Sequence, residues 1–221
     1  MQRYSKFAGT RIFKVGLIRV FVTVVVVFTI ACAQTADANQ DDSIPLINDN
    51  FPRLIITSQD IKELARKAET THKHLYELAI LLADDFMEEE PPRAQNAHNK
   101  YRSIGESLPS LGLAYQLTRD DKYLIGAEKW IRALLAVDTW EGSSNLGRSS
   151  WITGIAQTYD WLYHYLDDAL TIVIIRRLTE EAEIVKNTAA SHRALSNHLL
   201  IETSALGTVG LILKDGDPDR E

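Results

Sequence analysis

Asn197 and His198 stand at the start of a stretch that is otherwise nearly all apolar, and they are the first candidates for chemistry in this chain. Ser196 or Asn197 is expected to cap a final helix, which places His198 in the first turn. The free N–H groups and positive dipole end of a helix attract an anion such as a carboxylate. An amide beside an imidazole therefore fits a carboxylate-binding catalytic site. The structural alternative is a helix cap followed by a partly buried histidine.

A second candidate site combines aromatic residues with an arginine. Arg148 and Trp151 precede the run Tyr159-Asp160-Trp161-Leu162-Tyr163. Aromatic faces stack on sugar rings, and arginine pairs with carboxylates. Within a helical pattern the same residues are also typical of a protein core, so only those at the end of a cleft are expected to reach a ligand. Arg148, Trp151 and Tyr159 are the predicted substrate-binding residues.

Motifs for other reaction classes are not found in the sequence. It contains no His-Glu-x-x-His, no Gly-x-Ser-x-Gly and no phosphate-binding glycine loop. Its histidines lack metal-ligand spacing, and Cys32 is the only cysteine. We therefore expect no metal site and no cofactor.

Residues 1–33 are predicted to be a signal peptide. A basic leader is followed by the apolar stretch Val20–Ala31, which is short for a membrane span. One alternative is a lipoprotein signal, Thr29-Ile30-Ala31-Cys32, in which Cys32 becomes a lipid anchor, and another is a retained membrane anchor. We expect a periplasmic or secreted protein, or an outer-membrane lipoprotein, with no membrane span after signal cleavage.

Composition separates a linker from a folded domain in the rest of the chain, and it argues against one class of binding partner. Residues 34–50 are small, polar and acidic, which predicts a disordered linker before a domain at 51–221. The formal net charge is −6, and removal of the basic leader makes the mature chain more acidic. A strongly acidic exported domain is a poor candidate for nucleic-acid binding.

The apolar residues of the domain recur with helical spacing, and no alternating strand is evident. Thr57 and Asp60 are expected to form a capping box, and Pro109 to interrupt a later helix. Short loops favour antiparallel neighbours. The last helix is apolar on almost every side, whereas the helix at 170–186 is charged on one face, so we predict an all-α fold with an inner and an outer layer.

Four stretches together resemble the N-terminal helical domain of the heparinase II/III-like polysaccharide lyases, a group that includes oligo-alginate lyases. Each stretch alone is a weak signal, but their order across the domain is moderately specific. They are Phe51-Pro52-Arg53-Leu54-Ile55-Ile56-Thr57 before Asp60-Ile61, Leu113-Ala114-Tyr115-Gln116-Leu117-Thr118 before Asp121-Lys122-Tyr123-Leu124, Tyr159-Asp160-Trp161-Leu162-Tyr163, and Ser196-Asn197-His198-Leu199-Leu200.

The resemblance implies an incomplete (α/α) toroid of antiparallel helix pairs, without the C-terminal β-sandwich that follows in the family. It also implies β-elimination at a uronic acid of an acidic polysaccharide or oligosaccharide. Asn197 would match the residue that neutralises the uronate carboxylate, and His198 the neighbouring site histidine. Some members carry a glutamate three residues after this histidine, where Ile201 stands here, with Glu202 one position later.

The resemblance further implies that this chain is an N-terminal fragment of a lyase. The family's catalytic tyrosine and a further histidine would lie beyond Glu221, and Asp217-Pro218 is expected to begin another helix.

Two alternative functions remain open. A toroid glycoside hydrolase would need a pair of carboxylic acids, for which Asp160 and Glu202 are the candidates. A non-catalytic carbohydrate-binding or interaction module would bind without turnover.

Overall fold

The computed structural model describes residues 50–91, 102–140, 144–191 and 196–213, all within one compact unit, Asn48–Glu221. The predicted signal peptide, nearly all of the predicted linker and the helix expected at Asp217-Pro218 lie outside the described residues. Within the described ranges the regular structure is entirely helical, and this confirms the all-α class. No helix in these ranges combines the length and the apolar character needed to cross a membrane.

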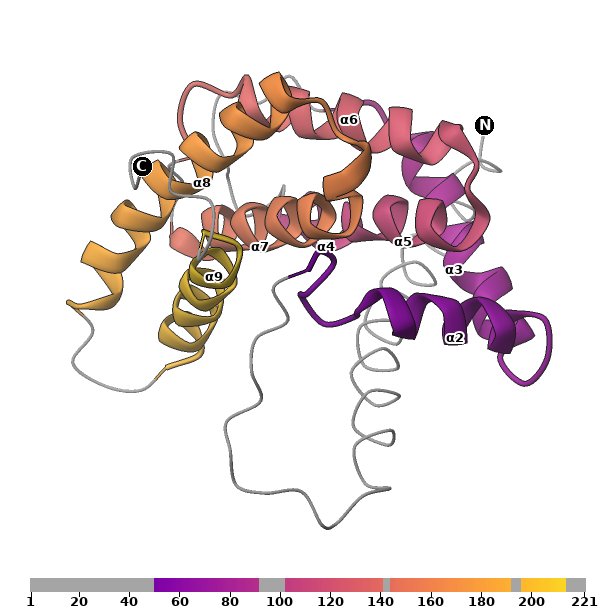
Figure 1. Ribbon diagram of the computed structural model, residues 1–221. Coiled ribbons are helices and arrows are strands. Elements are labelled where there is room, and N and C mark those ends of the chain that lie inside the picture. Colours follow the sequence, from indigo (N-terminus) through magenta and orange to yellow (C-terminus); the bar gives the residue numbers. More distant parts are fainter. Residues whose placement is uncertain (1–49, 92–101, 141–143, 192–195, 214–221) are drawn as a thin grey trace, which may run out of the picture. The chain divides into compact units, whose positions relative to one another are not determined.

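The helices differ greatly in length, and we name them as in Figure 1. In chain order they are α2 (Ser58–Ala68), α3 (Lys73–Met87), α4 (Arg102–Ser107), α5 (Pro109–Thr118), α6 (Asp121–Leu135), α7 (Asn145–Leu162), the short 3₁₀ helix η2 (Tyr163–Tyr165), α8 (Asp168–Ala189) and α9 (Asn197–Leu213).

The predicted start and stop signals act at the expected residues. The Thr57 hydroxyl accepts the Asp60 N–H at 3.3 Å while the Asp60 carboxylate accepts the Thr57 N–H at 2.8 Å, which completes the capping box of α2. Pro109 is the first residue of α5 and separates it from α4. Arg119 adopts a left-handed conformation that ends α5, and Asp120 caps α6 directly afterwards.

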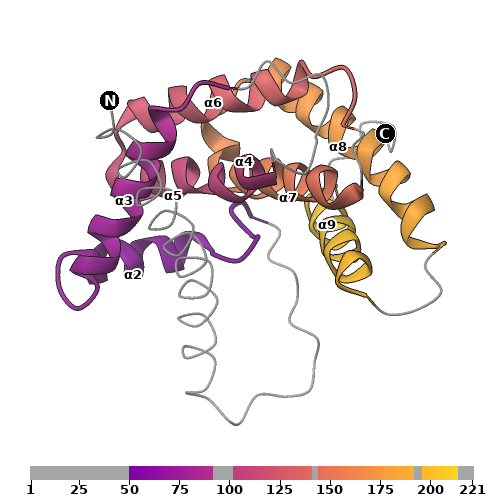
Figure 2. The same ribbon diagram turned by 180° about the vertical axis from the view of Figure 1, so that it is seen from behind.

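One row of helices is formed by the segment α4–α5 and by α7. Gly105 of α4 lies against Gly154 of α7, and farther along both segments Gly112 of α5 lies against Thr158 and Trp161 of α7. Contacts that advance together along both segments mean that the two run parallel. Figures 1 and 2 show this row crossing the unit from both sides.

A second row is formed by α6 and α8. Arg132 of α6 donates to Asp167, the N-cap of α8, at 2.8 Å, and Arg177 of α8 donates to the carbonyl of Val137, just after α6, at 3.0 Å. These two helices are therefore also parallel to each other. Because α5 and α6 are joined by a tight turn, the two rows run in opposite directions.

The hydrophobic core surrounds α7, which contacts α4, α5, α6, α8 and α9. Most of the side chains of α7 are buried, including Trp151, Ile152 and Ile155. Beyond its first turn, where Asn145 and Leu146 are partly exposed, the partly exposed positions form one polar stripe at Ser150, Thr153 and Gln157.

The last helix, α9, differs from the expectation of a helix buried on all sides. One face packs on α7 and α8 through Ala205, Val209 and Ile212. The opposite face carries Leu200, 62% exposed, and nothing in the described chain lies within 4 Å of a Cβ built on Gly207 or Gly210. The apolar composition therefore predicted correctly that the face with Ala205, Val209 and Ile212 is buried. The described residues provide a packing partner for that face alone.

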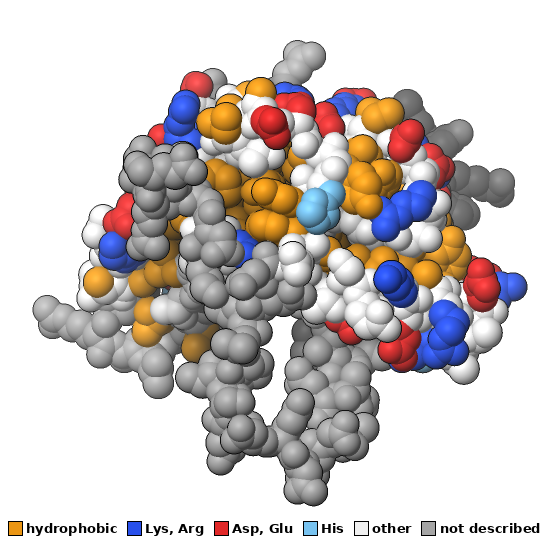
Figure 3. Space-filling view, in the orientation of Figure 1, with side chains coloured by type: hydrophobic (Ala, Val, Ile, Leu, Met, Phe, Trp, Pro, Cys, Tyr) orange, Lys and Arg blue, Asp and Glu red, His pale blue; other side chains and the backbone are white. Residues whose placement is uncertain are grey.

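Hydrophobic side chains also gather on other parts of the surface. Figure 3 shows them across the middle of one face, with Lys, Arg, Asp and Glu side chains around them. The largest exposed fractions outside α9 belong to Ile125 of α6 (67%) and Ile172 of α8 (57%). Single exposed residues of this kind are common on protein surfaces and by themselves indicate no partner.

Candidate functional site

The predicted catalytic pair lies at the first turn of α9. The Ser196 hydroxyl accepts the N–H of Leu199 at 3.2 Å, so Ser196 is the helix cap and Asn197 is the first helical residue. Asn197 is exposed and His198 is partly buried. The amide of Asn197 is therefore available to a ligand at the positive end of the helix dipole.

His198 and Asn197 point to different sides of α9. Positions 198, 202 and 205 are spaced by four and three residues, which places them on one face, and Glu202 and Ala205 on that face are buried. Glu202 is only 2% exposed. At the start of α9, Asn197 is therefore on the solvent side of the helix, and His198 is on the side that packs on the unit.

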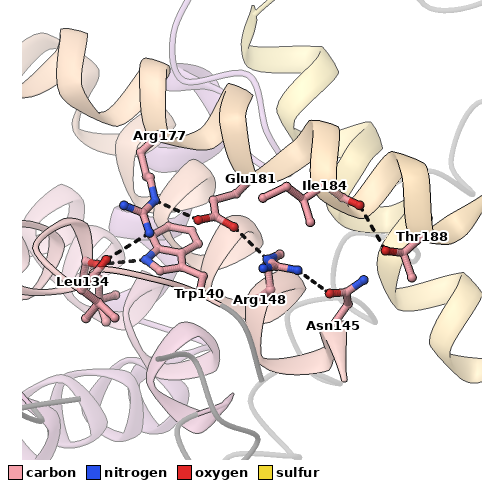
Figure 4. Close-up of polar contacts among 9 residues, drawn as sticks. Leu134, Trp140, Asn145, Arg148, Arg177, Glu181, Ile184 and Thr188 are labelled. Carbon is pink, nitrogen blue, oxygen red and sulfur yellow. Dashed lines mark hydrogen bonds and ion pairs between the residues drawn. The ribbon is translucent and has the colours of Figure 1, made fainter. Parts of the chain in front are cut away.

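A buried ion-pair network lies between the start of α7 and the second half of α8 (Figure 4). The Nε of Arg148 donates to one carboxylate oxygen of Glu181 at 2.7 Å, and the Nε of Arg177 donates to the other at 2.9 Å. The Nη1 of Arg148 also donates to the side-chain oxygen of Asn145 at 2.6 Å. Glu181 therefore holds two guanidinium groups and fixes α8 against the first turn of α7.

The predicted substrate-binding residues Arg148 and Trp151 are buried in this region. Arg148 is 6% exposed, and Trp151 packs edge-on against Trp140 at 5.5 Å between ring centroids. The guanidinium of Arg177 in turn lies 4.9 Å from the Trp140 ring. The contacts of Arg148 and Trp151 are those of a packed layer between α7 and α8, and their contact with a substrate stays a prediction.

Tyr159, the third predicted substrate-binding residue, is buried near the end of α7. Its ring meets both Phe51 and Tyr163 edge-on, at 5.9 and 5.7 Å between ring centroids, and Tyr163 stacks on Phe51 at 3.9 Å. Burial raises the pKa of the Tyr159 hydroxyl, so the hydroxyl stays protonated and the tyrosinate form that could act as a base is disfavoured. Two of the four stretches that carry the family resemblance thus pack on each other.

The carboxylate of Asp160 also joins the end of α7 to the segment that follows Phe51. The backbone N–H groups of Arg53 and Leu54 both donate to it, with N···O distances of 2.9–3.1 Å. Burial raises the pKa of Asp160 to about 6, although these N–H bonds and the nearby Arg53 charge favour the ionised form. The indole N–H of Trp161 completes the contact by donating to the Leu54 carbonyl at 2.9 Å.

Arg53 shows which ends of α7 and α9 lie together. Its backbone is bound by Asp160, close to the end of α7, and its Nη2 donates to the carbonyl of Ile212, close to the end of α9, at 2.8 Å. The C-terminal ends of both helices therefore lie at one end of the unit. Arg148 and the pair at 197–198 belong to the opposite end, whereas Tyr159 is distant from them.

Sequence reasoning missed Arg53 and Glu181 as the residues that organise these two ends. Helical spacing carried a signal for Glu181, because it stands three residues after Leu178 and four before Val185 on the apolar stripe of α8, and the neighbouring glutamates do not. Arg53 also had a signal, since it lies inside one of the stretches on which the predicted resemblance rests. The described residues hold no group of three His, Cys, Asp or Glu side chains able to bind a metal ion.

Comparisons with known proteins add no further constraint on this site. No protein-family model matches the chain, and no curated protein matches it.

Proposed function

We propose that this chain is the N-terminal helical part of a polysaccharide lyase that cleaves uronic-acid-containing chains by β-elimination. The observation that carries the proposal is the first turn of α9, where a serine cap leaves Asn197 exposed and His198 beside it. A helix N-terminus with an amide donor is suited to a carboxylate. The partner of the site is an acidic polysaccharide or oligosaccharide.

The reaction assigns a distinct task to each group. Hydrogen bonds from Asn197 to the uronate carboxylate reduce its negative charge and make the proton on C5 more acidic. A base removes that proton, its electron pair forms the C4=C5 double bond, and the C4–O bond breaks. A proton then passes to the departing oxygen. We assign to His198, in the same turn of α9, a contact with the same sugar, and the remaining acid–base group to another part of the enzyme.

We also propose that the helices form part of an (α/α) toroid with a β-sandwich domain following in the complete enzyme. The parallel course of α4–α5 and α7, and the parallel course of α6 and α8, support an inner and an outer row. The face of α9 that carries Leu200, Gly207 and Gly210 is the face that a further helix would cover. Glycine at such a face permits close approach of helices.

The glycoside hydrolase alternative receives less support from the geometry. Its two candidate acids are Asp160, which is fully buried and binds backbone N–H groups, and Glu202. Asp160 is near the end of α9 through Arg53 and Ile212, whereas Glu202 is ten residues earlier, about 15 Å along the helix. Carboxylates that flank one glycosidic bond lie roughly 5–9.5 Å apart.

Export of the protein is part of the same proposal. A uronate polymer is encountered outside the cytoplasm, and the basic and apolar leader fits secretion into the periplasm or beyond. Cys32 offers a lipid anchor to the outer membrane as a second route. Mass spectrometry of the exported N-terminus distinguishes the two routes, because lipidation adds the mass of the acyl chains.

The test uses the full-length protein encoded by the native gene. Incubation with alginate or a glycosaminoglycan should produce a rise in ultraviolet absorbance from the new C4=C5 bond. Asn197→Ala is expected to lower kcat by at least 100-fold, because loss of one donor to a developing anion typically costs that much. His198→Ala is expected to abolish turnover.

Thr203→Ala provides a matched control, since Thr203 is exposed one to two turns farther along the same helix and bonds only to backbone carbonyls. This variant should retain wild-type turnover. Circular dichroism of each variant verifies that α9 remains folded. Wild-type rates in both Asn197→Ala and His198→Ala would contradict the proposed site.

A further inference from the structure

A small pocket lies at the end of the unit opposite the Asn197–His198 pair. It has a volume of about 170 Å³ and is bounded by residues 53–55, by Thr153 and Gln157 of α7, and by Thr208 and Leu211 of α9. Thr208 follows Asn197 by three helical turns, about 16 Å along the axis. The pocket is therefore separate from the site proposed for β-elimination.

The pocket uses the partly exposed polar stripe of the central helix. Thr153 and Gln157 are one turn apart on α7 and are partly exposed, while their neighbours on α7 are nearly all buried. Thr153 and Gln157 on this stripe line the pocket together with Thr208. Three neutral groups that donate and accept hydrogen bonds thus line one space.

Arg53 gives this space a positive charge. Among the described residues that line the pocket, Arg53 is the only charged one and none carries a carboxylate. Its guanidinium is held by the Ile212 carbonyl at 2.8 Å and lies 4.2 Å from the centre of the Phe51 ring. The negative charge of Asp160 is bound to the backbone N–H groups of residues 53 and 54 and is not part of the lining.

The remaining lining is apolar. Leu54, Ile55 and Leu211 supply aliphatic surface beside the polar groups. A ligand that matches all three parts has a carboxylate for Arg53, hydroxyl groups for the threonines and glutamine, and a C–H face for the leucines. The volume is below the roughly 300–1,000 Å³ of sites for drug-sized ligands, so it fits one ring rather than a chain.

We propose that this pocket binds a single carboxylate-bearing monosaccharide unit, such as a uronic acid, as a second and non-catalytic binding site. The choice of a uronic acid as the probe rests on the proposed lyase function, whereas the class of hydroxylated carboxylates rests on the lining alone. Because the pocket joins residues 53–55 to the ends of α7 and α9, an occupied pocket also holds these three segments together.

The experiment measures binding of D-glucuronate to the signal-cleaved chain by isothermal titration calorimetry, with D-glucose as a neutral sugar of the same ring size. Glucuronate is expected to bind at least ten-fold more tightly than glucose because only the acid pairs with Arg53. Equal affinities for the two sugars would overturn the role of the pocket as an acid site.

Two matched pairs of variants locate the binding. Leu211→Trp fills the pocket and is expected to abolish binding, whereas Leu200→Trp adds the same side chain on an exposed part of α9 outside the lining and should have no effect. Thr208→Val should weaken binding several-fold. Thr203→Val removes a hydroxyl with the same bond to the carbonyl four residues earlier and should leave binding unchanged. Undiminished binding in Leu211→Trp would place the ligand elsewhere and overturn the proposal.

One further variant separates this proposal from the proposed function. Asn197→Ala should eliminate lyase turnover while retaining full glucuronate affinity at the pocket. If no lyase activity is found but Leu211→Trp still removes glucuronate binding, the pocket stands and the catalytic proposal fails. If Asn197→Ala and Leu211→Trp weaken binding equally, the two sites are not separate and the inference is wrong.

Discussion

At the scale of single residues, Asp160 joins the segment at residues 53 and 54 to the central helix. Its carboxylate binds the backbone of Arg53 and Leu54, and Arg53 in turn binds the end of α9. Asp160→Ala removes the acceptor for two N–H groups, of which that of Leu54 is buried, and each such loss costs roughly 1–3 kcal/mol. We expect the free energy of unfolding to fall by about 3 kcal/mol, measured by urea denaturation.

Asp160→Asn is the informative companion to that variant. A side-chain carbonyl in place of Oδ2 still accepts both N–H groups, since that oxygen lies 3.0 Å from the Arg53 nitrogen and 2.9 Å from the Leu54 nitrogen. The asparagine variant should therefore be more stable than the alanine variant. If both variants lose the same free energy of unfolding, Asp160 does not stabilise the fold by accepting these two hydrogen bonds.

At the scale of elements, the crossing of α4 and α7 depends on two glycines. A Cβ on Gly154 would lie 2.1 Å from the Gly105 carbonyl oxygen, and a Cβ on Gly105 would lie 2.2 Å from the Ser150 carbonyl oxygen. These neighbours are backbone atoms, so the helices must separate to accept a methyl group. We expect Gly154→Ala to lower the free energy of unfolding by about 2–3 kcal/mol, in the range of overpacked cores.

Gly207→Ala on α9 is the matched control, because nothing lies within 4 Å of its added Cβ. Alanine is the better helix former by about 1 kcal/mol, so this variant should be more stable than the wild type. Thermal unfolding of both variants, followed by circular dichroism, measures the two opposite shifts. A neutral Gly154→Ala variant would show that the close crossing does not determine stability.

The helices themselves were predictable because their signals are local. The Thr57–Asp60 box and the break at Pro109 each involve residues within a few positions of one another. The Gly105–Gly154 crossing was not predictable, since each glycine alone reads as a weak helix position. Nothing in the sequence shows that two such positions meet across a helix pair.

At the scale of the whole molecule, the candidate site was only partly accessible from the sequence. A cap at Ser196 or Asn197 and the position of His198 in the first turn follow from residue types, and the structure confirms the first turn and assigns the cap to Ser196. The burial of Arg148 against Glu181 depends on the path of the chain between α7 and α8. The same holds for the pocket at Arg53, which joins residues more than a hundred positions apart.

The stability of the unit should depend on pH through Asp160, because this one carboxylate joins the N-terminal segment to the central helix. Burial raises its pKa from 3.8 to about 6 in the folded state. The neutral form is therefore relatively favoured by folding, and the resulting stability is fully present below pH 3.8 and is lost as the pH rises through about 6. At 1.36 kcal/mol per pKa unit the contribution is at most about 3 kcal/mol.

Exposed carboxylates with lowered pKa, Asp167 and Glu63, act in the opposite direction. The measurement therefore compares wild type with Asp160→Asn by urea denaturation at pH 4 and pH 7. Wild type should gain up to about 3 kcal/mol over the variant on going from pH 7 to pH 4, and a difference that is constant between these pH values would show that the Asp160 pKa is the same in the folded and unfolded chain.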